Sequence, residues 1–184
     1  IAAHSNGRPL LGFIKADVDN LGKLFVFGLK REGEQKSYDT ISRLTTLSRM
    51  IDLFFSGWIE HLTEADEFKD CYTVFSGGDD LFLVGPWDEI LKLVNKIREE
   101  FYRYTGNSTI TLSAGVFMSN ARFPVSRASA EASDAVEQAK HIGRNAITVL
   151  GHPLPWTEWE FVRNEWNKLG VNSGEVSSAF LYNL

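Results

Sequence analysis

Apolar side chains along the chain fall into two patterns: short continuous runs, and longer segments in which they recur at every third or fourth position. The short runs have the length of β-strands and cover residues 10–17, 71–76, 81–85, 109–117 and 146–150. The recurrence at three and four predicts amphipathic helices over residues 39–62, 86–104 and 128–142. The order is β-α-β-β-α-β with an added helix and strand. It predicts a ferredoxin-like palm of the α/β (α+β) class, with an antiparallel central sheet flanked by helices.

Three aspartates stand where predicted strands end. Asp17 ends the first strand, and Asp79 and Asp80 lie in the turn that joins strands 71–76 and 81–85. In this fold the first strand lies beside that hairpin, so we expect the three carboxylates to converge. Oxygen ligands of this density suit Mg²⁺ or Mn²⁺, and two such ions about 3.5–4 Å apart bridge an attacking 3′ oxygen and a triphosphate. We predict that the three aspartates are catalytic metal ligands.

Gly77 and Gly78 precede the two acids of the turn. Glycine adopts a positive φ without strain, and a side chain at either position would obstruct a phosphate lying over the turn. We therefore predict that both glycines shape a phosphate site. The alternative is a solvated turn, since Gly and Asp are common in turns. The placement of the acids on a hairpin of apolar strands, opposite Asp17, favours the metal site.

The segment after the first strand carries further polar residues. Residues 17–22 resemble the metal loop that follows strand one in palm enzymes, where backbone N–H groups at a helix start receive phosphate oxygens. On that resemblance Val18 joins Asp17 at the metals. Asn20 and Gly22 are predicted to bind the nucleotide.

Two basic residues and one more acid leave alternatives open. Lys140 and Arg144 lie where the helix 128–142 turns into the last strand, and they can neutralise the triphosphate as a point charge and a fork. The alternative, ordinary capping of a helix C-terminus by basic residues, is compatible with that role. Asp19 is either a further metal ligand or a cap of the helical turn that follows it.

Composition narrows the class of protein. The 19 basic and 24 acidic side chains give a net charge of −5, which excludes a broad cationic surface for non-specific binding of DNA or RNA. The single cysteine, Cys71, has no disulfide partner, and the four histidines are isolated, so no Cys/His metal site is expected. No apolar run reaches the roughly 18 residues of a membrane span. We expect a cytoplasmic protein without a membrane partner.

The predicted domain organisation is a palm at residues 1–150, followed by a linker helix and the start of a helical C-terminal domain at residues 151–184. The tail carries Trp159 and Trp166 at helical spacing, which we expect to pack against protein rather than to stack on bases. The chain begins without Met and ends within an apolar run. We therefore expect a piece of a longer protein.

Four motifs together resemble a known family. They are Ala16-Asp17-Val18-Asp19-Asn20-Leu21-Gly22, Phe75-Ser76-Gly77-Gly78-Asp79-Asp80-Leu81, Leu112-Ser113-Ala114-Gly115, and Ala139-Lys140 with Gly143-Arg144-Asn145. The chain resembles the large palm/cyclase subunit of type III-A (Csm-type) CRISPR effector complexes. The resemblance covers about residues 1–150 and rests on all four motifs, because the acidic hairpin alone is not specific.

This resemblance implies an activity and a set of partners. In that family the palm with the Gly-Gly-Asp-Asp turn converts ATP to cyclic oligoadenylates when the assembled complex binds target RNA. Carried over, Asp17, Asp79 and Asp80 hold two Mg²⁺ or Mn²⁺ ions, and Lys140 meets the triphosphate. The implied partners are ATP, the other subunits of the complex, guide and target RNA, and the first palm of the same subunit. The family's His-Asp nuclease pair is not in this sequence, where no His is directly followed by an Asp.

Two other functions are compatible with parts of the pattern. A diguanylate cyclase shares the fold, but its hairpin motif favours Glu then Phe where this chain has Asp80 and Leu81. Phe68 and Cys71 also replace the Arg and Asp of that family's product-inhibition motif. A degenerate palm that only binds protein or nucleotide is the other alternative, and the complete acid triad argues against it.

Overall fold

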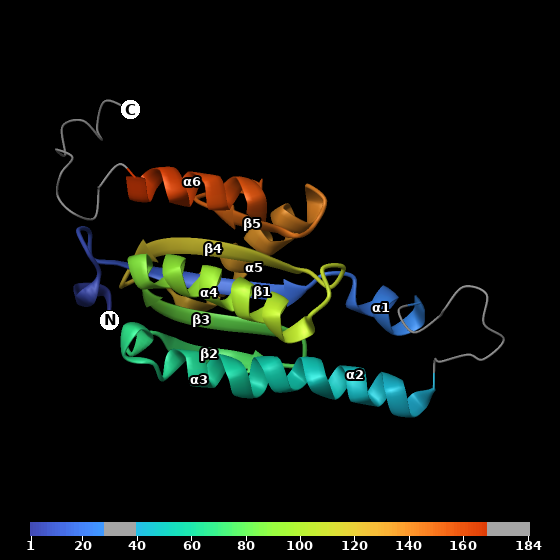
Figure 1. The fold of residues 1–184 in the computed structure, drawn as a ribbon. Helices are drawn as coiled ribbons and strands as arrows, with labels where there is room; N and C mark the ends of the chain where they lie inside the picture. Colours follow the sequence, from blue (N-terminus) through green and yellow to red (C-terminus); the bar gives the residue numbers. More distant parts are fainter. Residues whose placement is uncertain (28–39, 169–184) are drawn as a thin grey trace.

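The computed structural model describes residues 1–27 and 40–168. Its centre is a six-stranded sheet in the order β2-β3-β1-β4-β5-β6 (Figure 1). The strands are β1 (Leu10–Val18), β2 (Tyr72–Gly77), β3 (Asp80–Pro86), β4 (Leu112–Asn120), β5 (Ala146–Val149) and β6 (His152–Pro155). Neighbouring strands are antiparallel except β4 and β5, which run parallel. The predicted palm with its antiparallel centre is confirmed.

Helices cover both faces of this sheet (Figure 1). The α-helices are α1 (Leu21–Phe27), α2 (Ile41–Leu53), α3 (Ile59–Thr63), α4 (Trp87–Thr105), α5 (Val125–His141) and α6 (Trp156–Lys168). Short 3-10 helices span Ala2–His4 and Asp66–Phe68. Within residues 1–27 and 40–168, no helix combines the length and the apolar character that a membrane crossing requires.

Strand β1 divides its side chains between the two faces of the sheet. Ile14 packs in the main core, which α4 closes, whereas Phe13 packs with Phe82 and with Ala128 of α5. Successive side chains of a strand point to opposite faces. Asp17, four residues after Phe13, therefore lies on the α5 face of the sheet.

The close approach of α5 to the sheet depends on a glycine in β4. A Cβ on Gly115 would lie 2.6 Å from Ala135 Cβ and 2.6 Å from the backbone nitrogen of Val136. Only glycine allows the helix to lie at this depth. The depth of α5 in turn fixes where its C-terminal end, which carries Lys140, meets the sheet.

Two segments differ from the sequence prediction. The predicted helix 39–62 is α2, a π-helical segment (Phe54–Trp58) and α3 in direct succession. The sheet also continues past residue 150 through β6, a strand that we did not predict because two of its four residues are proline, which is rare in strands.

The residues after β6 pack onto the palm. Trp156 is fully buried and donates its indole N–H to the Leu112 carbonyl at 2.8 Å. Trp159 is buried as well and donates to Asn95 Oδ1 at 2.8 Å, so the predicted packing role is confirmed for this residue. Trp166 is 44% exposed. The predicted start of a helical C-terminal domain falls largely on residues 169–184, outside the described residues.

Candidate functional site

Two of the three predicted carboxylates meet across neighbouring strands. The antiparallel register of β1 and β3 places Asp17 directly opposite Asp80, and side chains in such a pair lie on the same face of the sheet. Burial raises the pKa of Asp17, with smaller contributions from the charges of Asp79 and Asp19. Burial and the charge of Asp79 likewise raise the pKa of Asp80. We call Asp17 and Asp80 the acid pair.

Lys140, at the end of α5, binds Asp17 of the acid pair. Its Nζ lies 2.9 Å from Asp17 Oδ1 and 3.4 Å from Glu137 Oε1, and the Lys140 and Asp17 side chains are only 19% and 30% exposed. Burial alone lowers the pKa of Lys140, but the hydrogen bond and the charge of Asp17, with a smaller effect of Glu137, raise it above its ordinary value. An ammonium group therefore provides positive charge at the carboxylates.

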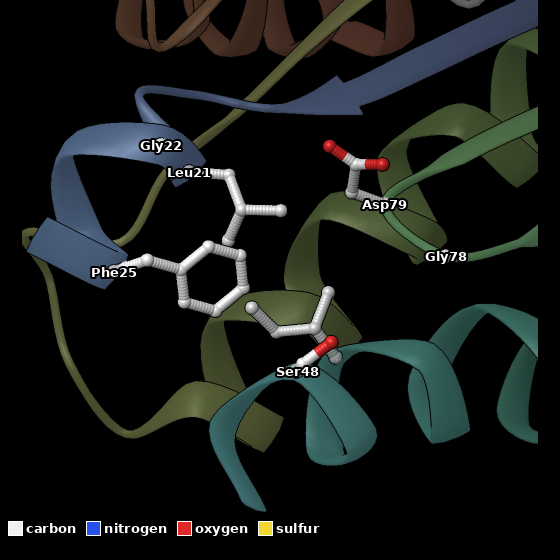
Figure 2. A pocket seen from close by; sticks show the side chains of 7 residues that line it. Leu21, Gly22, Phe25, Ser48, Gly78 and Asp79 are labelled. Carbon is white, nitrogen blue, oxygen red and sulfur yellow. The ribbon is translucent and has the colours of Figure 1, made fainter. Parts of the chain in front are cut away.

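Asp79 lines a pocket beside the acid pair. The pocket has a volume of about 370 Å³, and its other lining residues are Leu21, Gly22, Phe25, Ser48, Ile51 and Gly78. Figure 2 shows the Asp79 side chain extending from the turn towards the side of the pocket where Leu21 and Gly22 lie. The charge of Asp79 nevertheless raises the pKa of both members of the acid pair. The pocket and the acid pair are thus adjacent parts of one site.

The three carboxylates do not form a single tight cluster. Among residues 1–27 and 40–168, no group of three His, Cys, Asp or Glu side chains is arranged to hold a metal ion. The expected convergence is therefore met by Asp17 and Asp80 but not by Asp79, which belongs to the pocket. The residues still fit a hard divalent cation, because the donors are oxygen atoms only and the Lys140 ammonium already stands in as a cation on Asp17.

The turn that carries the acids depends on Gly78 for its backbone shape. Gly78 has a φ of +67°, and a Cβ at this position would meet no atom within 4 Å. The structure thus requires glycine for the left-handed conformation rather than for space. The Gly78 N–H donates to Asp52 Oδ1 on α2 at 2.8 Å. Sequence analysis missed Asp52, a lone exposed acid on a helix that no motif marks.

Asp19 has a structural role that neither sequence interpretation foresaw. It is 4% exposed and accepts hydrogen bonds from Thr111 Oγ1 at 2.7 Å, Ser113 Oγ at 2.6 Å and the Asn145 N–H at 2.9 Å. These contacts join the end of β1 to the start of β4 and to the turn before β5. The Asp19 carboxylate is fully engaged in holding three segments together.

The other predicted nucleotide-binding residues lie at the borders of the site. Asn20 has a φ of +54°, and its carbonyl accepts the Leu24 N–H at the start of α1. In the turn after α5, Arg144 is exposed and has a φ of +67°. Gly143 ends the helix with a φ of +126°, as expected of a terminator. A contact of Asn20 or Arg144 with a nucleotide stays a prediction.

Comparison with known proteins gives the family of this arrangement. Residues 10–148 match the family described as Cas10/Cmr2, second palm domain. The chain is 35% identical, over 95% of its length, to the CRISPR system single-strand-specific deoxyribonuclease Cas10/Csm1 (subtype III-A) of Methanocaldococcus jannaschii, of which it covers 25%. The chain thus spans about a quarter of the length of this curated relative.

Two solved structures of Csm1-Csm4 cassettes share the fold. The one in complex with one ATP has a TM-score of 0.75 at 32% identity, and the match covers 86% of this chain and 24% of that chain. The one in complex with cA4 has a TM-score of 0.82 at 28% identity, and the match covers 99% of this chain and 29% of that chain. The motifs, the sheet order and the family match agree, and the chain belongs to the Cas10/Cmr2 family as its second palm domain.

Proposed function

We propose that this palm is the nucleotidyltransferase domain of a type III CRISPR effector, which converts ATP to cyclic oligoadenylates when the complex binds target RNA. The observation that carries the proposal is the acid pair of Asp17 and Asp80 beside a pocket that Asp79 lines. The Csm1-Csm4 cassettes that share this fold are described in complex with one ATP, pppApA and cA4. In the proposed reaction these three ligands would be the substrate, a linear intermediate and a cyclic product.

The acidic residues of the site would hold Mg²⁺ or Mn²⁺. We assign Asp17 and Asp80 as carboxylate ligands, with a backbone contribution from Val18, and Asp79 as a third ligand that would have to turn towards the acid pair from the adjacent pocket. The bound ions would supply Lewis-acid chemistry, activating the 3′ hydroxyl and neutralising the triphosphate. A divalent ion would take the place of the Lys140 ammonium on Asp17, and the ammonium would then be available to meet a phosphate oxygen. This exchange gives Lys140 one role in each state of the site.

The pocket suits the nucleoside part of ATP. Leu21, Phe25 and Ile51 offer apolar surface for a purine base, while Ser48 adds a hydroxyl at the wall formed by α2. Pockets of this kind, mostly apolar with a few placed polar groups, are typical of small-molecule sites. Gly22 lies at the start of α1, on the side that faces Asp79, where we place the phosphates with Gly77, Asn20 and Arg144 around them.

The second reactant requires a second site. Joining two nucleotides needs an acceptor 3′ hydroxyl and a donor triphosphate held together, and the pocket of about 370 Å³ is of a size for one nucleotide. We propose that the first palm of the same subunit holds the other nucleotide. A Csm4 subunit is the further partner, because the cassettes of similar fold contain one, and guide and target RNA join through the complete complex.

The proposal is tested with the full-length subunit in its assembled complex. The complex is incubated with target RNA, Mn²⁺ and each nucleoside triphosphate in turn, and the products are identified by mass. We expect cyclic oligoadenylate from ATP and no product without target RNA. A guanine-containing product from GTP alone would favour the diguanylate cyclase alternative. Binding of ATP without any product would favour a palm that only binds nucleotide.

A further inference from the structure

The acidic turn is fastened to the neighbouring helical segment at two points. Asp52 of α2 accepts the Gly78 N–H at 2.8 Å, and Ser76 Oγ donates to the Phe55 carbonyl at 2.5 Å. One contact holds the turn itself, and the other holds the end of β2 just before it. On the helical segment the two contacts involve Asp52 and Phe55, three positions apart. On the hairpin they involve Ser76 and Gly78, two positions apart.

The helical segment is itself firmly anchored. Phe54 and Phe55, directly after Asp52, are completely buried, and the Phe54 ring packs edge-on against Phe101 of α4 at 5.1 Å between centroids. The same residues begin the π-helical segment Phe54–Trp58, a conformation that is often found at functional sites. The turn is therefore held against a part of the core that cannot easily shift.

The hydrogen bond between Gly78 and Asp52 joins two sides of the pocket. Ser48 of α2 lies on one side of the pocket, and Gly78 and Asp79 of the turn lie on another (Figure 2). Ile51 of α2 also lines the pocket. Asp52 follows Ile51 directly and binds the residue that precedes Asp79. This hydrogen bond, made by the residue directly before Asp79, is thus a direct link between the two sides.

We infer that Asp52 is a positioning residue of the nucleotide site. Its carboxylate holds Gly78 in the left-handed conformation and so fixes the pocket width and the direction of Asp79. It also occupies the Gly78 N–H, so that this donor is not offered to a phosphate. The inference rests on the proposed function for its catalytic consequence, whereas the hydrogen bond itself can be tested without any activity.

Three variants separate the hydrogen bond from the charge. D52A removes both, D52N removes the charge but keeps an acceptor oxygen, and E60A removes a charge from the exposed side of the same helical segment without touching the turn. They are compared in the full-length subunit within its complex, with target RNA. Two quantities are measured: the dependence of product formation on ATP concentration, and amide hydrogen exchange of peptides that cover residues 76–81.

We expect D52A to lower kcat about tenfold and to raise KM for ATP, because displacement of a reacting group by about 1 Å costs on the order of a hundredfold in rate. D52N should restore both constants to within about twofold, since an amide oxygen also accepts the N–H. E60A should match wild type. Exchange at the turn should become faster in D52A and stay at the wild-type rate in D52N and E60A.

Two results would overturn the inference. One is a D52A variant with the kinetics and the turn exchange of E60A. The other is a D52N variant as impaired as D52A, which would assign the effect to charge. If the wild-type complex makes no cyclic product, the proposed function fails, and the exchange comparison alone then decides: unchanged exchange in D52A overturns the positioning role, and faster exchange supports it.

Discussion

Asp17 and Asp19 are two residues apart, yet their surroundings are opposite. Asp19 is buried and accepts three hydrogen bonds from β4 and from the turn before β5. Asp17 is partly exposed, lies opposite Asp80, and is bound by one lysine. A buried carboxylate with both oxygens hydrogen-bonded to the protein stabilises the fold. A carboxylate crowded by like charges, with a raised pKa, has capacity left for a ligand.

The largest expected effect is a loss of activity, without a loss of stability, when the acidic turn is changed. Replacing Asp79 and Asp80 together with alanine should abolish nucleotide synthesis by the full complex. The free energy of unfolding should change by less than about 0.5 kcal/mol for each site, because neither side chain has a hydrogen bond or ion pair within the described residues. Product assays and urea unfolding measure the two effects. Retained synthesis would remove both residues from the metal site.

The next effect concerns Asp19. D19A leaves the hydroxyls of Thr111 and Ser113 and the Asn145 N–H without their acceptor. Loss of a buried acceptor of this kind should lower the free energy of unfolding by about 3 kcal/mol. D134A, which removes an exposed aspartate from α5, is the matched control and should unfold like wild type. A D19A variant as stable as this control would contradict the structural role of Asp19.

The third prediction concerns Lys140, whose ammonium group is bound to Asp17. K140M leaves the partly buried Asp17 carboxylate without its ammonium, which should raise the pKa of Asp17 further. The free energy of unfolding at pH 7 should fall by about 1 kcal/mol, the typical contribution of such a hydrogen-bonded contact. E137A removes the longer contact of Lys140 at 3.4 Å and keeps the one to Asp17, so it should have a smaller effect. Equal stability of K140M and wild type would show that the ion pair contributes nothing.

The smallest expected effect is a pH dependence at Asp80. Burial and the charge of Asp79 raise the pKa of Asp80 above its ordinary value of 3.8. The folded state therefore holds this proton more tightly, and the free energy of unfolding falls as the pH rises from 3.8 through the raised pKa. D80N lacks this titration. It should be more stable than wild type at pH 7, with an advantage that shrinks as the pH falls to 3.8, as urea unfolding across that range would reveal.

The sequence was sufficient to predict the helices and strands with strong periodicity, and to predict that Asp17 and Asp80 lie on neighbouring strands. The apolar run ending at Asp17 and the acids of the hairpin predicted that β1 and β3 meet, and the register confirms it for Asp80. The direction of Asp79 depends on the positive φ of Gly78 and on its hydrogen bond to Asp52. Those are contacts between distant segments, and they leave no periodic signal.

Two further features were beyond sequence reasoning for the same physical reason. β6 is a short edge strand with two prolines, which pattern alone assigns to a loop. Asp19 stands in the motif beside Asp17, so both look like ligands until the hydroxyls of Thr111 and Ser113 are seen around one of them. Spacing along the chain shows which residues gather at a site. Only the partners of each carboxylate show which one is already satisfied.

The most direct test of the central claim is binding of Mn²⁺ to the full-length subunit in the presence of ATP, measured by electron paramagnetic resonance. The wild-type subunit should bind Mn²⁺ at this palm, and the part of the bound signal that appears on addition of ATP should be lost when Asp17 and Asp80 are both replaced by asparagine. The Asp134→Asn variant, which changes an exposed acid of α5, should bind as wild type does. Unchanged Mn²⁺ binding after the double replacement would contradict the assignment of the acid pair as the metal site.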